Sequence, residues 1–142
     1  MLMQAQNRIQ QQVGHIVSIS PMYITAAWGL TDQPDFMNQC LVIETPFPPQ
    51  LCMLKLLHIE KQMGRKREIK WGPRTIDIDI LFFDHLKLKS TLLEVPHPFL
   101  HERRFVLEPL TSIAPNYIHP TFGKSLKSLL VNCTDYSPIK KK

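Results

Sequence analysis

The segment 71–81 constrains the fold more than any other part of the chain. From 76 to 80, isoleucine alternates strictly with aspartate. Neighbouring side chains of a β-strand point to opposite faces, so this alternation predicts a strand over 74–83 whose three isoleucines face a core. Asp77 and Asp79 then share the other face, with their backbones ~6.5–7 Å apart.

Two carboxylates on one face repel each other unless a cation neutralises them, and a hard divalent ion bound by oxygen ligands does so in many proteins. Arg74 lies beside them in the sequence and offers a planar fork of donors that matches phosphate oxygens. Aspartates and arginine together predict a phosphate site that uses a metal. The alternative is a solvated polar face of an edge strand.

A glycine-rich phosphate loop of the Gly-x-x-x-x-Gly-Lys-Ser/Thr type is absent from the sequence. Side chains must therefore hold any nucleotide, and the basic loop before the strand supplies candidates. A solvated run of charges is the alternative reading of this loop. Its cationic residues are Arg65, Lys66, Arg67 and Lys70.

Two further groups of residues suggest ligand contacts. His97 stands between two prolines, with Arg103 six residues later, which favours a second phosphate contact. Aromatic, amide and hydroxyl side chains elsewhere suit a flat, nitrogen-rich heterocycle, although core packing explains any one aromatic equally well. These residues are Thr25, Trp28, Phe36 and Asn38, with Phe105 for the opposite face.

The order of predicted elements indicates an α+β sandwich, with a largely antiparallel sheet and helices packed on it. One domain is expected over 1–138, followed by a disordered basic tail over 139–142. The hydrophobic and turn patterns predict helices over 1–13, 48–64, 100–113 and 125–131, and strands over 16–25, 36–45, 74–83 and 86–88.

Composition restricts the function classes. The three cysteines are far apart and form no Cys-x-x-Cys pair, which favours free thiols in a reducing, cytoplasmic compartment. No apolar run approaches the ~20 residues of a membrane span, so no membrane partner is expected. The net charge is +5, but three of these charges belong to Lys140, Lys141 and Lys142, which argues against a nucleic-acid partner.

The segment 71–81 closely resembles the signature of the hydroxymethyl-dihydropterin pyrophosphokinases, enzymes of folate biosynthesis. The likeness continues in 32–38 and from 95 through Arg103, Phe105 and Pro109 to 115, and it covers about 14–115. It implies a ferredoxin-like α+β fold. It also implies transfer of the β,γ-pyrophosphoryl group of ATP to the hydroxymethyl oxygen of a reduced pterin, with release of AMP.

The resemblance also implies roles for particular residues. Asp77 and Asp79 are expected to hold two Mg²⁺ ions, and Asp77 to polarise the attacking hydroxyl. The expected phosphate contacts are Arg65, Arg67, Arg74, His97 and Arg103; the nucleotide side is Glu60, Lys70 and Trp71; and the pterin contacts are Thr25, Ala26, Trp28, Phe36, Asn38 and Phe105.

The sequence departs from the family pattern in three places. Pro98 replaces a frequent aromatic residue, and the loop between Gly64 and Trp71 is one residue short. Family members begin with a strand and a Gly-Ser-Asn segment before the first helix, whereas this sequence begins inside that helix. Because that strand is central in a ferredoxin-like sheet, we expect a slot with unpaired backbone groups in its place.

Three other functions remain open at this stage. A ferredoxin-like sheet can bind RNA, but two carboxylates on its working face would repel a phosphate backbone. A metal-dependent hydrolase would use the same two aspartates on a phosphoester. An inactive, truncated remnant of a pyrophosphokinase is the third. The oligomeric state does not follow from the sequence.

Overall fold

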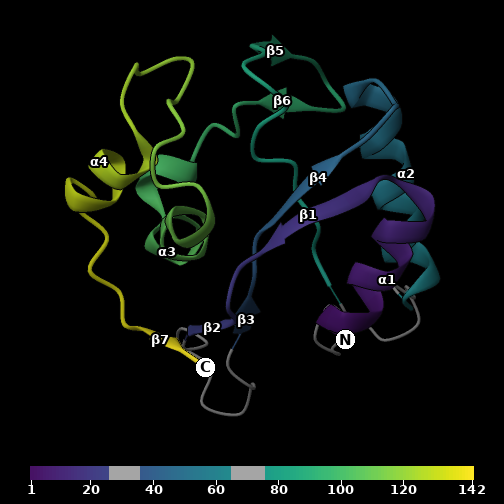
Figure 1. The fold of residues 1–142 in the computed structure, drawn as a ribbon, viewed down its shortest axis with the longest axis horizontal. Coiled ribbons are helices and arrows are strands. Elements are labelled where there is room, and N and C mark those ends of the chain that lie inside the picture. The colour runs from purple at the N-terminus through teal and green to yellow at the C-terminus, as the bar shows by residue number, and fades with distance from the viewer. Residues whose placement is uncertain (26–35, 65–75) are drawn as a thin grey trace.

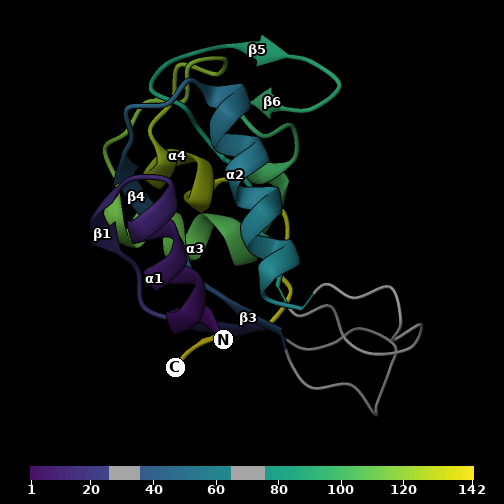
Figure 2. The same ribbon diagram turned by 90° about the vertical axis from the view of Figure 1, so that its right-hand side faces the viewer.

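The computed structural model describes residues 1–25, 36–64 and 76–142, which form three layers. Two helices, α1 and α2, cover one side of a layer of strands, and α3 and α4 cover the other (Figure 1). The view turned by 90° places α1 and α2 in front of α3 and α4 (Figure 2). The helices are α1 (Leu2–Gln12), α2 (Pro49–Gln62), α3 (Arg104–Ile113) and α4 (Leu126–Val131), with a short 3-10 turn at Leu100–Glu102.

The first helix forms because its apolar residues recur at helical spacing and meet those of α2. Ala5, Ile9 and Val13 are buried, and Ile9 and Val13 pack against Leu56 and Ile59 of α2. The predicted helix over 1–13 is therefore confirmed. The prediction for α2 is confirmed too, since this helix begins with a proline in its first turn and ends before a glycine with positive φ.

Each of the two predicted long strands is divided into two short ones. The break at Ser20 and Pro21 ends the first strand, and the hydroxyl of Ser20 accepts a hydrogen bond from the backbone N–H of Cys40 at 2.9 Å. The chain turns there between two small antiparallel sheets. Strand β1 (His15–Ile19) pairs with β4 (Leu41–Glu44), and β2 (Tyr23–Thr25) pairs with β3 (Phe36–Asn38); a further hairpin joins β5 (Leu88–Lys89) to β6 (Glu94–Val95).

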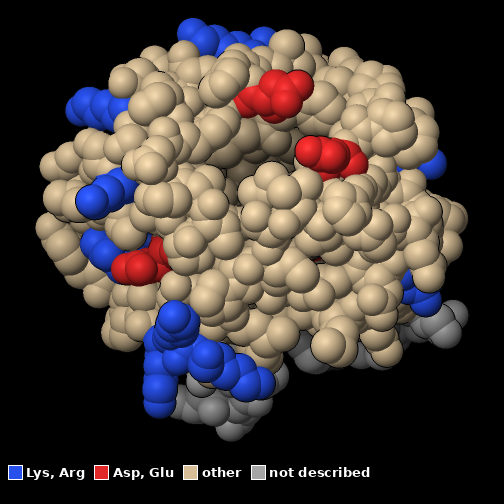
Figure 3. Space-filling model, viewed as in Figure 1, with Lys and Arg blue, Asp and Glu red and all other residues tan. Residues whose placement is uncertain are grey.

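The carboxyl terminus differs from the prediction of a disordered tail. Strand β7 (Ile139–Lys141) pairs antiparallel with β2, with Thr25 opposite Ile139. The prediction was wrong because β2 has a free edge whose backbone groups accept a strand of any charge. Figure 3 has the same view as Figure 1, and it shows basic side chains gathered where Figure 1 marks the carboxyl terminus.

The predicted strand over 74–83 is wrong for the portion that the structure describes. Within its described portion, 76–83, no strand ladder is formed, yet the burial alternates as expected: Asp77 and Asp79 are exposed, and the three isoleucines are partly buried. The alternation therefore comes from packing of the isoleucine side chains, because Ile78 and Ile80 contact the core between α1 and α2.

A cavity of about 570 Å³ runs between β4 and the segment 76–84. Consecutive residues of both segments line it, from Gln39 to Thr45 and from Ile76 to Asp84. Consecutive side chains of extended chain point to opposite faces, so a cavity that touches them all lies along the backbone edges. Within the described residues β4 pairs only with β1.

The three cysteines, Cys40, Cys52 and Cys133, are buried and free, as predicted. Burial raises the pKa of the Cys40 thiol to about 12. Among the described residues, no helix combines the length and hydrophobicity that crossing a bilayer requires.

We predict that Gly14→Ala destabilises the protein. A Cβ atom at this position would lie 2.2 Å from the carbonyl oxygen of Glu44, and a backbone oxygen in β4 cannot move away without disturbing the β1–β4 pair. The expected loss of unfolding free energy is about 1–3 kcal/mol, measured by urea denaturation.

Gly123→Asn is the matched control. Gly123 has a φ of +65°, which asparagine tolerates, and no atom lies within 4 Å of its ideal Cβ. A change of about 0.5 kcal/mol or less is expected there. Equal losses in the two variants would contradict the close approach at Gly14.

Candidate active site

Asp77 and Asp79 lie exposed on one face of the extended segment 76–82. Ile78 and Ile80 anchor the opposite face on the core of α1 and α2. Leu81 continues the aspartate face but packs under α3 and α4 with Phe82. The two carboxylates therefore lie at the exposed end of this face, before it is covered by α3 and α4.

His97 is held beside this segment by a backbone hydrogen bond. Its N–H donates to the carbonyl oxygen of Leu81 at 2.9 Å, which brings the β6 end of the chain next to Asp79. The backbone N–H of Phe99 donates to Nδ1 of His97 at 3.3 Å, so in the neutral ring the proton is on Nε2. The histidine thus offers one N–H donor.

The pKa of His97 is lowered from its ordinary value. Partial burial is the largest cause, and the positive charge of Arg103 acts in the same direction. The negative charges of Asp79 and Glu94 act in the opposite direction. These influences place Asp79, His97 and Arg103 in one electrostatic neighbourhood, as the sequence predicts.

Arg103 directly precedes α3, and its guanidinium lies between two aromatic rings. The distances from its central carbon are 5.4 Å to the centroid of Phe99 and 5.9 Å to that of Phe105. Such contacts hold a guanidinium while leaving its N–H groups available. Arg104 points elsewhere, because it binds the backbone oxygen of Asp135 and the carboxylate of Glu108.

Phe99 is the one residue of this group that the sequence reasoning missed. It is half exposed, and its ring also meets that of His97 edge-on, with centroids 6.2 Å apart. Its position two residues after His97 in a proline-rich segment was the available signal.

The predicted pterin residues meet on the paired strands β2 and β3. The amide of Asn38 donates to the hydroxyl of Thr25 at 3.1 Å, and Thr25 lies opposite the exposed Phe36 in the strand register. Helix α3, which carries Phe105, contacts both strands. Thr25, Phe36 and Asn38 are thus brought together on two strands that α3 contacts.

Glu60, the remaining described nucleotide-side residue, is buried near the end of α2 with 3% of its surface exposed. The other predicted site residues lie outside the described part of the chain. They are Ala26, Trp28, Arg65, Arg67, Lys70, Trp71 and Arg74.

The carboxylates that the structure describes fit a hard divalent cation only if a bound substrate supplies further oxygen ligands. Asp77 and Asp79 supply carboxylate oxygens, which Mg²⁺ prefers. Among residues 1–25, 36–64 and 76–142, no group of three or more histidine, cysteine or acidic side chains is arranged to hold a metal ion. Mg²⁺ is commonly bound by one or two carboxylates together with substrate phosphates, and the exposed pair suits that mode.

Comparison with known proteins agrees with this geometry. Residues 1–115 match the family model described as 7,8-dihydro-6-hydroxymethylpterin-pyrophosphokinase. The chain is 47% identical over 112 residues to a 2-amino-4-hydroxy-6-hydroxymethyldihydropteridine pyrophosphokinase of Aquifex aeolicus and 39% identical over 122 residues to one of Synechocystis sp.. It is 38% identical over 125 residues to a folic acid synthesis protein of Dictyostelium discoideum.

The matches cover most of this chain but a smaller share of its relatives. They span 79%, 84% and 88% of this chain, and 70%, 62% and 19% of the three relatives in the same order. A family match over 115 residues, with identities well above 30%, is sufficient to assign the family. The chain belongs to the 7,8-dihydro-6-hydroxymethylpterin-pyrophosphokinase family.

Proposed function

We propose that the protein transfers pyrophosphate from ATP to 6-hydroxymethyl-7,8-dihydropterin in folate biosynthesis. Family membership supports the reaction type and the substrates. The observation that carries the proposal for this chain is the exposed pair Asp77 and Asp79, which lies beside His97 and Arg103.

The reaction makes one bond and breaks one. The hydroxymethyl oxygen of the pterin bonds to the β-phosphorus of ATP, and the bond from that phosphorus to the oxygen bridging to the α-phosphorus breaks. The hydroxyl loses its proton and AMP leaves with the bridging oxygen. Such transfers depend chiefly on in-line positioning and on neutralising charge.

Asp77 and Asp79 would hold Mg²⁺, and we propose two ions. When bound, the metal neutralises phosphate charge. The aspartates would orient the triphosphate through these ions, and Asp77 would also polarise the attacking hydroxyl. Their exposure allows a large anion to approach once the carboxylate charge is compensated.

His97 and Arg103 would contact the phosphates from the other side. His97 donates through Nε2, and its lowered pKa keeps the ring neutral at pH 7. Arg103 offers a fork that Phe99 and Phe105 hold in place. The further phosphate contacts proposed are Arg65, Arg67 and Arg74, and those to the nucleotide are Glu60, Lys70 and Trp71.

The pterin would bind against β2, β3 and the start of α3. Thr25 and Asn38 present a hydroxyl and an amide within one hydrogen-bonded pair, and Phe36 and Phe105 offer aromatic rings for a flat heterocycle. Ala26 and Trp28 complete the proposed set.

A ferredoxin-like arrangement is the finer fold that we propose. It is supported by the position of α1 and α2 on one side of the strands and by the antiparallel pairs. A cytoplasmic location and a single domain that includes β7 belong to the same proposal.

Product analysis tests the reaction. With ATP, Mg²⁺ and 6-hydroxymethyl-7,8-dihydropterin, one AMP should form per pterin pyrophosphate, and none without the pterin. A metal-dependent hydrolase would instead release phosphate or pyrophosphate when no pterin is present, and a remnant would produce neither.

Asp77→Asn and Asp79→Asn should each lower kcat/KM by about 10²–10⁴-fold, because each removes a metal ligand worth several kcal/mol. Since both side chains are exposed, the unfolding free energy should change by no more than about 0.5 kcal/mol. Steady-state kinetics and urea denaturation provide both values. The control Asp84→Asn, also exposed and at a φ of 50° that asparagine tolerates, should keep normal activity. A near-normal kcat/KM in either Asp77→Asn or Asp79→Asn would contradict the proposed metal ligands.

Arg103→Lys should lower kcat/KM by about 10- to 100-fold, since an ammonium group cannot reproduce a bidentate guanidinium contact. The neighbouring arginine gives a matched control: Arg104→Lys changes a side chain engaged with Asp135 and Glu108 and should leave kcat/KM within about twofold. Equal effects in the two variants would remove the phosphate role from Arg103.

The pKa of His97 should lie below 6.5 and respond to its charged neighbours. In metal-free buffer, Asp79→Asn should lower this pKa further because a negative charge that favours the imidazolium is lost, whereas Arg103→Gln should raise it. Histidine Cε1–H signals followed by NMR against pH measure both shifts. Asp84→Asn should leave the pKa of His97 unchanged. An unchanged pKa of His97 in Asp79→Asn would contradict the electrostatic interaction between Asp79 and His97.

A further inference from the structure

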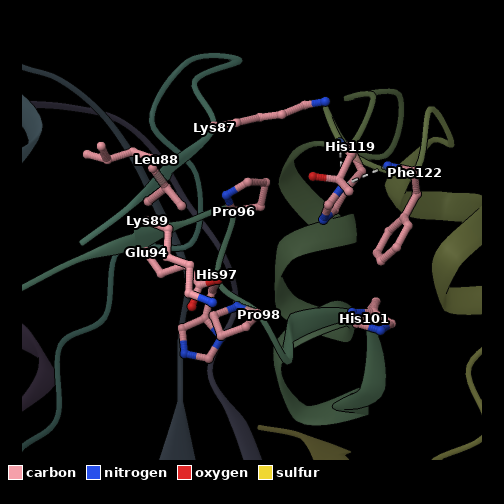
Figure 4. A pocket seen from close by; sticks show the side chains of 12 residues that line it. Lys87, Leu88, Lys89, Glu94, Pro96, His97, Pro98, His101, His119 and Phe122 are labelled. Carbon is pink, nitrogen blue, oxygen red and sulfur yellow. Dashed lines mark hydrogen bonds between the residues drawn. The ribbon is translucent and has the colours of Figure 1, made fainter. Parts of the chain in front are cut away.

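A second pocket, of about 420 Å³, lies between the β5–β6 hairpin and the loop that leads to α4. His97 and Glu94 lie on its hairpin side, next to the proposed active site, whereas His101, His119 and Phe122 lie across from them (Figure 4). Apart from His97, none of the residues lining this pocket belongs to the proposed substrate site.

His119 is the most constrained side chain in this pocket. It is 2% exposed, and its Nδ1 accepts the backbone N–H groups of Thr121 at 3.1 Å and of Phe122 at 3.3 Å. Its ring stacks on Phe122 with centroids 4.4 Å apart and meets the edge of Phe82 at 5.4 Å. The ring orientation is thereby fixed, and the proton of the neutral ring must be on Nε2.

The Nε2–H group of His119 has no hydrogen-bond partner among the described residues. In the same part of the chain, every fully buried side-chain nitrogen and oxygen does have a partner, so this atom must be in contact with the pocket rather than sealed inside the protein. Figure 4 shows the ring nitrogen pointing away from Phe122, into the open space. A fixed, buried donor at a cavity wall is a feature of ligand sites.

Two further nitrogen-bearing side chains, those of Lys87 and His101, line the pocket with this donor. Lys87 extends across the pocket towards His119, and His101 lies on the same wall (Figure 4). Burial, His101 and Lys87 all lower the pKa of His119, so this ring remains a neutral donor at pH 7. Nε2 of His101 lies 3.6 Å from a carboxylate oxygen of Glu102, and Glu94 lines the hairpin side together with Lys89.

We propose that Lys87, His101 and His119 form a binding site for a phosphate group. An ammonium group and N–H donors that line one pocket complement an oxyanion, because charge-assisted hydrogen bonds are stronger than neutral ones. The phosphate can be free or part of a small molecule, and the apolar walls at Phe122, Pro96 and Pro98 leave room for an attached group. Lys87, His101 and His119 themselves have no role in the proposed pyrophosphokinase site.

NMR of the full chain tests this site without ATP or pterin. Inorganic phosphate, added at constant ionic strength, should shift the Cε1–H signals of His119 and His101 along one saturable curve. Lys87→Gln removes an exposed charge and should weaken this binding about tenfold, whereas Lys127→Gln, outside the pocket, should leave it unchanged.

Three results would overturn the proposal: shifts that do not saturate, equal affinity in Lys87→Gln and the parent protein, or shifts confined to His97. Phenyl phosphate distinguishes the possible sources of the group. Tighter binding of this probe than of inorganic phosphate would support a phosphate carried on a ring-bearing molecule, and equal or weaker binding would support the free anion.

Discussion

The alternate packing of one extended segment, 76–82, is the constraint on which the rest of the site depends. Ile78 and Ile80 pack against the core of α1 and α2, and Leu81 packs against residues of α3 and α4. With the isoleucine face packed in this way, Asp77 and Asp79 are exposed on the opposite face. The backbone hydrogen bond from His97 to Leu81 places His97 next to the same segment. The segment that contributes to the core therefore also positions the residues of the proposed site.

The site combines opposite charges in a small space. Two carboxylates repel each other, while Arg103 and the donor His97 favour an anion. The carboxylates alone would repel an anion, and Arg103 alone would repel a cation. Under the proposed function a metal-bound triphosphate would satisfy both at once, because the aspartates would bind its cations and the arginine and histidine would bind its oxygens.

The sequence predicted the features that depend on side-chain periodicity. The spacing of Ile9 and Val13 gave α1, and the isoleucine–aspartate alternation gave the exposed carboxylates. Features that depend on backbone pairing were missed. Strand β7 forms because the edge of β2 is open, and no pattern in its lysines signals this. The role of Phe99 was also missed, because its ring is placed by the 3-10 turn that separates it from Arg103.

Binding of Mn²⁺ in the presence of a non-hydrolysable ATP analogue tests the central claim most directly, since the paramagnetic ion broadens NMR signals of nearby nuclei. Backbone signals of 76–80 and the ring signal of His97 should broaden in the parent protein, and this effect should be lost in the double variant Asp77→Asn/Asp79→Asn. Equal broadening in the double variant, or broadening elsewhere only, would contradict a metal and nucleotide site on this face.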